Sequence, residues 1–266
     1  MKKILLLGAA AIMAAGAMQA KTAEELRLYI NPGHGNYGPN DRPMATIPYP
    51  MLPETGRPDS AGFYESTTNL YRSLPMKEKL MQMGVKESNI MFSRVANGPY
   101  PYVSGSPENN KFDRSLSEIC EEVDANNMDF FISVHSNAGT EGSTTNYPLI
   151  LYRGTDGDGG DLATGSRAMA QAMWAPHYMD EIDPQSFYSR TNQNVRGDIS
   201  FYGSSATRHG TKGDYTGYLG VLKHGVPGFL IEGYFHTYQP ARHRALNKDY
   251  CRQDARKRFK NTVSLR

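Results

Sequence analysis

The sequence has few cysteines, a single tryptophan and no strong excess of charge of either sign. Its two cysteines, Cys120 and Cys251, lie far apart and do not form a metal-binding motif. The 29 basic residues nearly balance the 27 acidic ones, which leaves a formal net charge of +2. Nothing in this balance indicates nucleic-acid binding, because no strong basic field is present. Internal repeats and a clear interdomain linker are also absent, so a single domain is predicted.

Long hydrophobic runs are lacking except at the amino terminus. Lys2 and Lys3 precede an uncharged apolar stretch over 4–18, which is too short and too rich in alanine for a comfortable membrane span. We therefore predict a secretory signal peptide over residues 1–20 and a mature domain over 21–266, with a retained anchor as the alternative. The protein is then expected in the periplasm, the cell envelope or outside the cell, without stable membrane insertion after cleavage.

The charge and cysteine patterns change once the predicted signal peptide is removed. Residues 1–20 carry two lysines and no acidic residue, so the net charge falls from +2 to 0. Export makes a disulfide chemically possible. However, Cys120 lies on the apolar stripe of a predicted helix, so a buried thiol explains it at least as well.

Strand-like and helix-like patterns alternate along the chain, as expected for an α/β domain. Strands are predicted at 26–30, 89–94, 130–134, 149–152 and 228–231, and helices at 65–83, 115–123, 163–174 and from 239 onward. Pro75 is expected to kink the first helix or divide it in two. Segments 36–62, 97–110 and 184–216 are predicted to be irregular, and 154–161 is predicted to be a turn.

Three apolar strands each end at a side chain that can bind a metal or transfer a proton. These side chains are His34, His135 and Glu232. Open α/β sheets form sites beyond the carboxyl ends of their strands, so the three groups converge if the strands are parallel neighbours. Glu65, at the start of a predicted helix, can lean into the same crevice.

Two imidazoles and one carboxylate are a known set of catalytic zinc ligands. Zinc lowers the pKa of a bound water far below that of free water, to about 7, and an unligated carboxylate can take the proton and pass it to a leaving amine. Glu232 is the candidate for that carboxylate. Each residue alone has a structural explanation, since Glu65 also suits a helix amino terminus and Glu232 also suits an ion pair.

The resemblance to a known family rests on three short blocks. INPGHG at 30–35, SVHSNA at 133–138 and LIEGYF at 230–235 resemble the signature segments of the zinc-dependent N-acetylmuramoyl-L-alanine amidases, the amidase-3 family. Glu65, followed by Asn69 and Leu70, resembles the second metal ligand of that family and its helix. The similarity extends from about residue 26 to residue 235.

The resemblance implies a fold and an activity. His34, Glu65 and His135 would hold Zn²⁺, and Glu232 would act as general base, with Asn137 supporting the site. The family fold is a single three-layer α/β domain with a mixed, mostly parallel sheet between helices. The family substrate is the amide between N-acetylmuramic acid and L-alanine in peptidoglycan. An activator protein is conceivable, but the sequence does not identify one.

The chain departs from the family pattern at several positions. The gap between His34 and Glu65 is longer than expected, which leaves Glu54 as a competing ligand. Ile119 stands where the family typically has arginine, and residues 252–266 are unusually basic. Two alternative functions stay open. The ligand set alone does not exclude a zinc peptidase that acts on stem peptides, and the long insertion and unusual tail keep open an inactive protein that binds the cell wall.

Overall fold

The computed structural model describes most of the chain outside its amino terminus. The described residues are 21–35, 51–52, 57–58, 64–98, 103–140, 143–174, 194–202 and 218–252. The predicted signal peptide, Glu54 and the last part of the basic tail lie outside these ranges. Within the described part, no helix combines the length and the apolar character needed to cross a bilayer.

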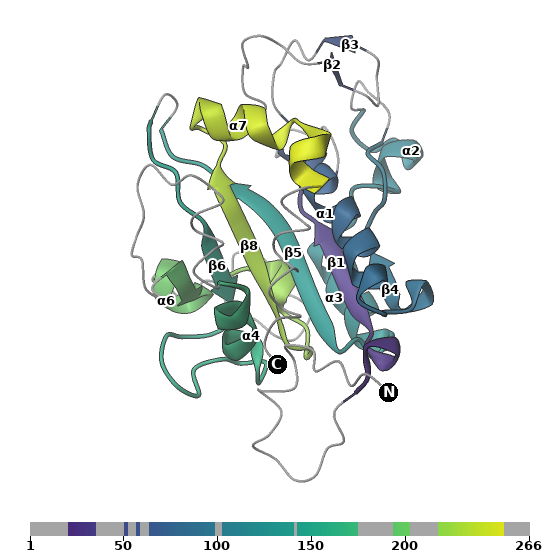
Figure 1. Cartoon of the computed structure of the whole chain (residues 1–266), viewed down its shortest axis with the longest axis vertical. Helices are drawn as coiled ribbons and strands as arrows, with labels where there is room; N and C mark the ends of the chain where they lie inside the picture. Colours follow the sequence, from purple (N-terminus) through teal and green to yellow (C-terminus); the bar gives the residue numbers. More distant parts are fainter. Residues whose placement is uncertain are drawn as a thin grey trace.

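A six-stranded mixed sheet forms the centre of the molecule (Figure 1). Its strands, in spatial order, are β4 (Ile90–Phe92), β1 (Leu28–Pro32), β5 (Phe130–Asn137), β8 (Gly228–Phe235), β6 (Leu149–Tyr152) and β7 (Val195–Gly197). The first four are mutually parallel, whereas β6 runs antiparallel to β8 and β7 runs parallel to β6. The predicted mixed, mostly parallel sheet is therefore confirmed.

Helices cover both faces of this sheet and complete three layers. The core on one face joins strand residues such as Ile132 to α1 (Glu65–Gln82), α4 (Ser166–Met173) and α7 (Gln239–Ala245). The core on the other face joins Phe131 to α3 (Leu116–Ala125) and the short helix η5 (Gly220–Leu222). Neighbouring strand residues point to opposite faces, so β5 supplies both cores, as its almost wholly apolar sequence predicts.

Several short elements lie in segments that were predicted to be irregular, and those predictions were wrong in part. β7 and α6 (Asp198–Tyr202) fall within 184–216, α2 (Pro107–Asn110) within 97–110, and the antiparallel pair β2 (Met51–Leu52) and β3 (Arg57–Pro58) within 36–62. The single turns η1 (Ala23–Glu25) and η3 (Glu87–Asn89) precede β1 and β4. None of these elements is long enough to show a periodic pattern. Whether such a short segment forms a strand or a helix is therefore decided by pairing and capping in the folded chain.

The buried side chain of Asp198 illustrates this tertiary control. Its carboxylate accepts hydrogen bonds from the main-chain N–H groups of Gly154, Tyr218 and Leu219, at 2.9, 2.7 and 2.9 Å. These partners lie far apart in the sequence. The fold at the end of β7 therefore depends on contacts that no local pattern contains.

The two cysteines are not joined by a disulfide. Cys120 lies on α3 and is fully buried, and Cys251 is also buried. The prediction of a buried thiol at Cys120 is thus confirmed.

The helix that begins at Glu65 is continuous through Pro75. Of the two outcomes expected at this proline, a kink or a division into two helices, the division was therefore wrong. α1 spans 18 residues with this proline in its interior. The ring removes one backbone hydrogen bond. Met76 and Leu80, which are almost wholly buried in the core beneath α1, hold the helix against the sheet on the carboxyl side of the proline.

We expect Pro75→Ala to stabilise the protein, because alanine restores the missing hydrogen bond in a helix that is already continuous through this position. The free energy of unfolding should rise by about 1–3 kcal/mol, given a proline penalty of roughly 3 kcal/mol in helix interiors. Chemical denaturation measures this change. Glu78→Ala, at an exposed position of the same helix, is the control and should change stability by less than about 0.5 kcal/mol. A Pro75→Ala variant no more stable than wild type would contradict the explanation.

Candidate metal centre

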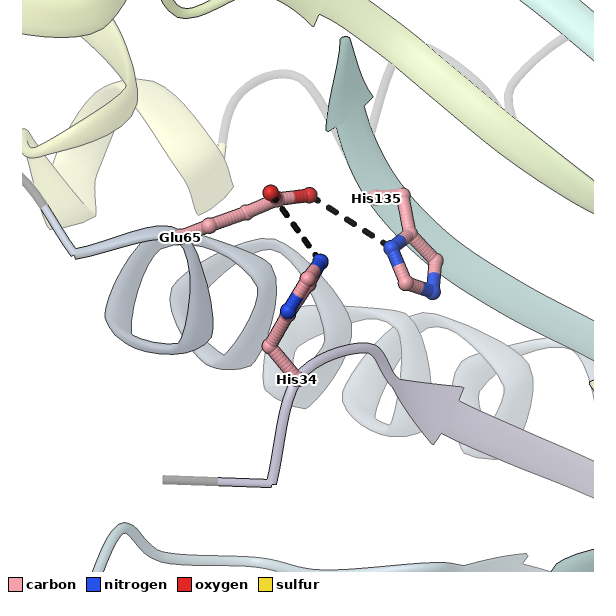
Figure 2. Close-up of side chains that lie close together, drawn as sticks. All are labelled: His34, Glu65 and His135. Carbon is pink, nitrogen blue, oxygen red and sulfur yellow. Dashed lines mark ion pairs between the residues drawn. The ribbon is translucent and has the colours of Figure 1, made fainter. Parts of the chain in front are cut away.

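Three side chains that can bind a metal converge at the carboxyl ends of β1 and β5 (Figure 2). The Nε2 atom of His34 lies 3.1 Å from Oε2 of Glu65, and Nδ1 of His135 lies 3.4 Å from Oε1. The ligand atoms of all three residues lie within 4.8 Å of one another. The structure therefore brings together the three residues named from the sequence. Their role as ligands stays a prediction.

Parallel pairing of β1 with β5 places the two histidines side by side. Pro32 is in register with Val134, and the N–H of Gly33 donates to the carbonyl of Val134 at 2.9 Å. His34 then leaves the strand direction with a φ of 53°, in the left-handed region that side chains other than glycine rarely adopt. Strained backbone of this kind is concentrated at functional sites. Here it turns the imidazole toward Glu65.

Gly33 is required for the close approach of the two strands at the site. A Cβ atom at this position would lie 2.1 Å from Cε1 and Nε2 of the His135 ring. The ring therefore occupies the space that a side chain at Gly33 would need. This glycine is part of the INPGHG block. The structure explains its presence, because a side chain here would collide with the His135 ring.

Glu65 is the first residue of α1 and its side chain is almost completely buried. The Ser136 N–H donates to Oε1 at 2.8 Å, and Nδ2 of Asn69 lies 3.4 Å from the same oxygen. The amino-terminal end of a helix also favours negative charge. Burial alone would raise the pKa of the Glu65 carboxyl, but the imidazoles of His34 and His135 hold that pKa well below its ordinary value. The carboxylate is therefore ionised.

The pKa of the His135 imidazole shifts in the direction that favours its neutral form. Burial lowers the pKa of its imidazole, and this effect outweighs the attraction of Glu65 for the charged form. Metal binding requires neutral histidine and ionised carboxylate. Two imidazoles and one carboxylate, supplied by a loop, a strand and a helix terminus, thus fit a catalytic zinc site in both donor type and protonation.

Glu232 lies beside this cluster on the next strand. It is half-buried within β8 and in register with His135 on β5. Neighbouring strands are about 4.8 Å apart, and residues paired in register point to the same face. β1, β5 and β8 are therefore the parallel neighbours that the predicted convergence requires, and the role of Glu232 stays a prediction. Both β5 and β8 extend beyond the predicted strand ends, to Asn137 and Phe235, and include these functional side chains.

His236 is a site residue that the sequence reasoning missed. Its side chain is 1% exposed, and its Nδ1 atom lies 2.9 Å from Oγ of Ser136 and 4.0 Å from Oε2 of Glu65. Its location just after β8, a strand that reaches the same edge, is the signal that would have identified it. The side-chain oxygen of Asn137 accepts a hydrogen bond from the N–H of Ala138, and the supporting role expected for Asn137 stays a prediction.

Buried arginines hold the main chain around the ligands. The Arg94 guanidinium donates to the carbonyls of Gly33 and Ser66, at 3.1 and 2.8 Å. Arg242 donates to the carbonyl of His236 at 2.8 Å. Ile119, which stands where the resembling family typically has arginine, packs in the apolar core beneath the other face of the sheet. The support of this site is therefore built from arginines elsewhere in the chain.

Comparison with solved structures identifies the fold. The chain is similar to an N-acetylmuramoyl-L-alanine amidase from Clostridium difficile 630, with a TM-score of 0.57 and 19% identity over 91% of this chain and 96% of that chain. It is also similar to the catalytic domain of CwlV, an N-acetylmuramoyl-L-alanine amidase from Bacillus (Paenibacillus) polymyxa var. colistinus, with a TM-score of 0.56 and 16% identity over 90% and 96%.

A third similar structure is the CwlD amidase from Clostridioides difficile in complex with the GerS lipoprotein. Its TM-score is 0.56, with 15% identity over 91% of this chain and 100% of that chain. No protein-family profile and no curated protein matches the sequence. The protein has the fold of N-acetylmuramoyl-L-alanine amidases, so the resemblance noted from the three sequence blocks is confirmed at the level of the fold.

We expect Gly33→Ala to weaken metal binding, because the added methyl group would displace the His135 ring. A loss of roughly 10- to 100-fold in zinc affinity is expected, as for other changes that misorient a metal ligand. Competition with a chromogenic chelator measures this affinity. Gly139→Ala is the matched control, since a Cβ atom there would make only ordinary contacts of 3.6 Å or more. Equal zinc affinities in the two variants would contradict this role of Gly33.

Proposed function

We propose that this protein is a zinc-dependent N-acetylmuramoyl-L-alanine amidase, which hydrolyses the amide between N-acetylmuramic acid and L-alanine in peptidoglycan. The observation that carries this proposal is the convergence of His34, Glu65 and His135 beside Glu232. The fold shared with solved amidases supports the choice of substrate. The first line of support is the placement of a few side chains, and the second is the arrangement of the helices and strands.

The proposed metal ligands differ in their access to solvent. The side chains of His34 and His135 are 25% and 17% exposed, whereas that of Glu65 is 3% exposed. Glu65 is therefore the most buried of the three, and the two imidazoles are the proposed ligands that solvent reaches. A zinc ion held by these residues would polarise the scissile carbonyl and lower the pKa of a water molecule.

Glu232 is proposed as the general base. It is placed beside His135 by strand pairing and is not one of the three clustered ligands. Its carboxylate would take a proton from the attacking water and deliver it to the nitrogen of the leaving L-alanine, so that the stem peptide departs as a neutral amine. A rigid central strand suits this role, since proton transfer requires a fixed position near the reacting atoms.

The proposal also sets the expected location and partners. Peptidoglycan lies outside the cytoplasmic membrane, so the enzyme would be exported, which agrees with the signal peptide predicted over residues 1–20. One similar amidase was solved together with a lipoprotein. An activating partner is therefore proposed for this chain as well, without a defined binding surface.

The roles of the ligands and the base are separable by mutation. We expect Glu232→Gln to retain zinc and to lose activity by on the order of 10²- to 10⁴-fold, the usual contribution of general acid–base catalysis. His34→Ala should lose both zinc and activity. Metal analysis and peptide release from purified peptidoglycan measure the two properties. Full activity in the Glu232→Gln variant would exclude the proposed mechanism.

The substrate bond is identified by product analysis. The purified protein is incubated with peptidoglycan, with and without a chelator, and the products are read by mass spectrometry. Chelator-sensitive release of intact stem peptides that carry a free L-alanine amine is expected. Cleavage inside the stem would indicate the zinc peptidase. Absence of products from folded, zinc-loaded protein, together with binding to sacculi, would indicate a cell-wall-binding protein.

A further inference from the structure

A buried arginine on α1 connects the helix of Glu65 to the strand of His135. Arg72 follows Glu65 by seven residues, which is about two helical turns, so both side chains lie on the same side of the helix. Its side chain is buried, with the residue only 4% exposed. The Nη1 atom donates to the main-chain carbonyl of His135 at 2.8 Å. A hydrogen bond thus links the helix that carries one proposed ligand, Glu65, to the backbone of another, His135.

The same guanidinium lies against β8 at Gly233 and Tyr234, the two residues that follow Glu232. Its central carbon is 5.2 Å from the centroid of the Tyr234 ring. A Cβ atom at Gly233 would lie 1.8 Å from Nη2 of Arg72. Gly233 therefore leaves the space into which the guanidinium fits. Arg72 contacts the backbone of β5 at a proposed ligand, and the backbone of β8 at the residue that follows the proposed base.

The burial of Arg72 opposes folding, so its presence on α1 calls for an explanation other than stability. Among the residues that the structure describes, no carboxylate pairs with Arg72, and its charge is met by one carbonyl and one aromatic ring. Burying an arginine with so few polar contacts opposes folding. The adhesion of α1 to the sheet does not require it, since Met76 and Leu80 already pack into the core.

We infer that Arg72 is a positioning residue that sets α1, and with it Glu65, at a fixed place relative to His135 and Glu232. The inference rests on the proposed function for the role of Glu232, whereas its effect on the metal ligands is measurable without any substrate. Arg72 acts through the backbone of the site strands. Gly233 is its structural complement, because any larger residue there would displace the guanidinium.

The test compares Arg72→Met, Gly233→Ala and the double variant in the full protein. Zinc affinity is measured by competition with a chromogenic chelator, and melting temperature is measured without zinc. We expect Arg72→Met to lower zinc affinity by about 10- to 100-fold, the usual effect of losing a group that orients metal ligands. Gly233→Ala should produce a similar loss. The double variant should bind zinc no worse than Arg72→Met, because the added methyl group then meets no guanidinium.

Met76→Ala is the matched control for a loss of packing on the same helix. It removes a fully buried side chain from the core and does not touch the site. We expect it to lower the melting temperature while leaving zinc affinity unchanged at temperatures where the protein is folded. Arg72→Lys, which keeps a charge and a donor, replaces Arg72→Met if that variant does not fold, and is expected to show a smaller loss of zinc affinity.

Two results would overturn the inference. The first is wild-type zinc affinity in both folded Arg72 variants. The second is a double variant in which the losses from Arg72→Met and Gly233→Ala add, since independent effects would exclude a shared space. Failure of the proposed function is distinguishable, because it would show as absent peptidoglycan cleavage by wild-type protein while the zinc affinities still followed the expected pattern.

Discussion

The ionised carboxylate of Glu65, buried between the imidazoles of His34 and His135, is the group around which the site is organised. A buried charge is destabilising unless hydrogen bonds and opposite charge compensate it. Here the compensation comes from the two imidazoles, the Ser136 N–H and the amino-terminal end of α1. These partners belong to separate parts of the chain. The carboxylate therefore requires β1, β5 and α1 to be assembled together.

Support for the cluster comes mainly from groups that bind main-chain carbonyls. Arg94 holds the carbonyl of Gly33, Arg72 holds that of His135, and Arg242 holds that of His236. Side chains that fix the backbone in this way restrict where the imidazoles can point. Such outer contacts matter because metal affinity depends on ligand orientation as well as on ligand identity. The arrangement also explains why so many cations are buried at one edge of the sheet.

Much of the fold was predictable because long apolar patterns report burial directly. The run at 130–134 is apolar on both sides of the strand, and it became the central strand β5 with a core on each face. Of the kink or division expected at Pro75, the division did not occur, since packing of Met76 and Leu80 outweighs the local preference of proline. β7 was missed because three residues show no periodicity, and its pairing with β6 is what makes it a strand.

The sequence by itself determined the chemical types at the site. Two histidines and a glutamate after apolar strands, with a second glutamate at a helix start, already supply the residue types of the proposed metal ligands and the proposed base. Only the tertiary structure decided which of them meet, because register between parallel strands and the place of α1 are set by contacts between distant segments. The same reason explains why His236 and Arg72 escaped notice: each is an ordinary residue in its local sequence, and its role exists only through what the fold places beside it.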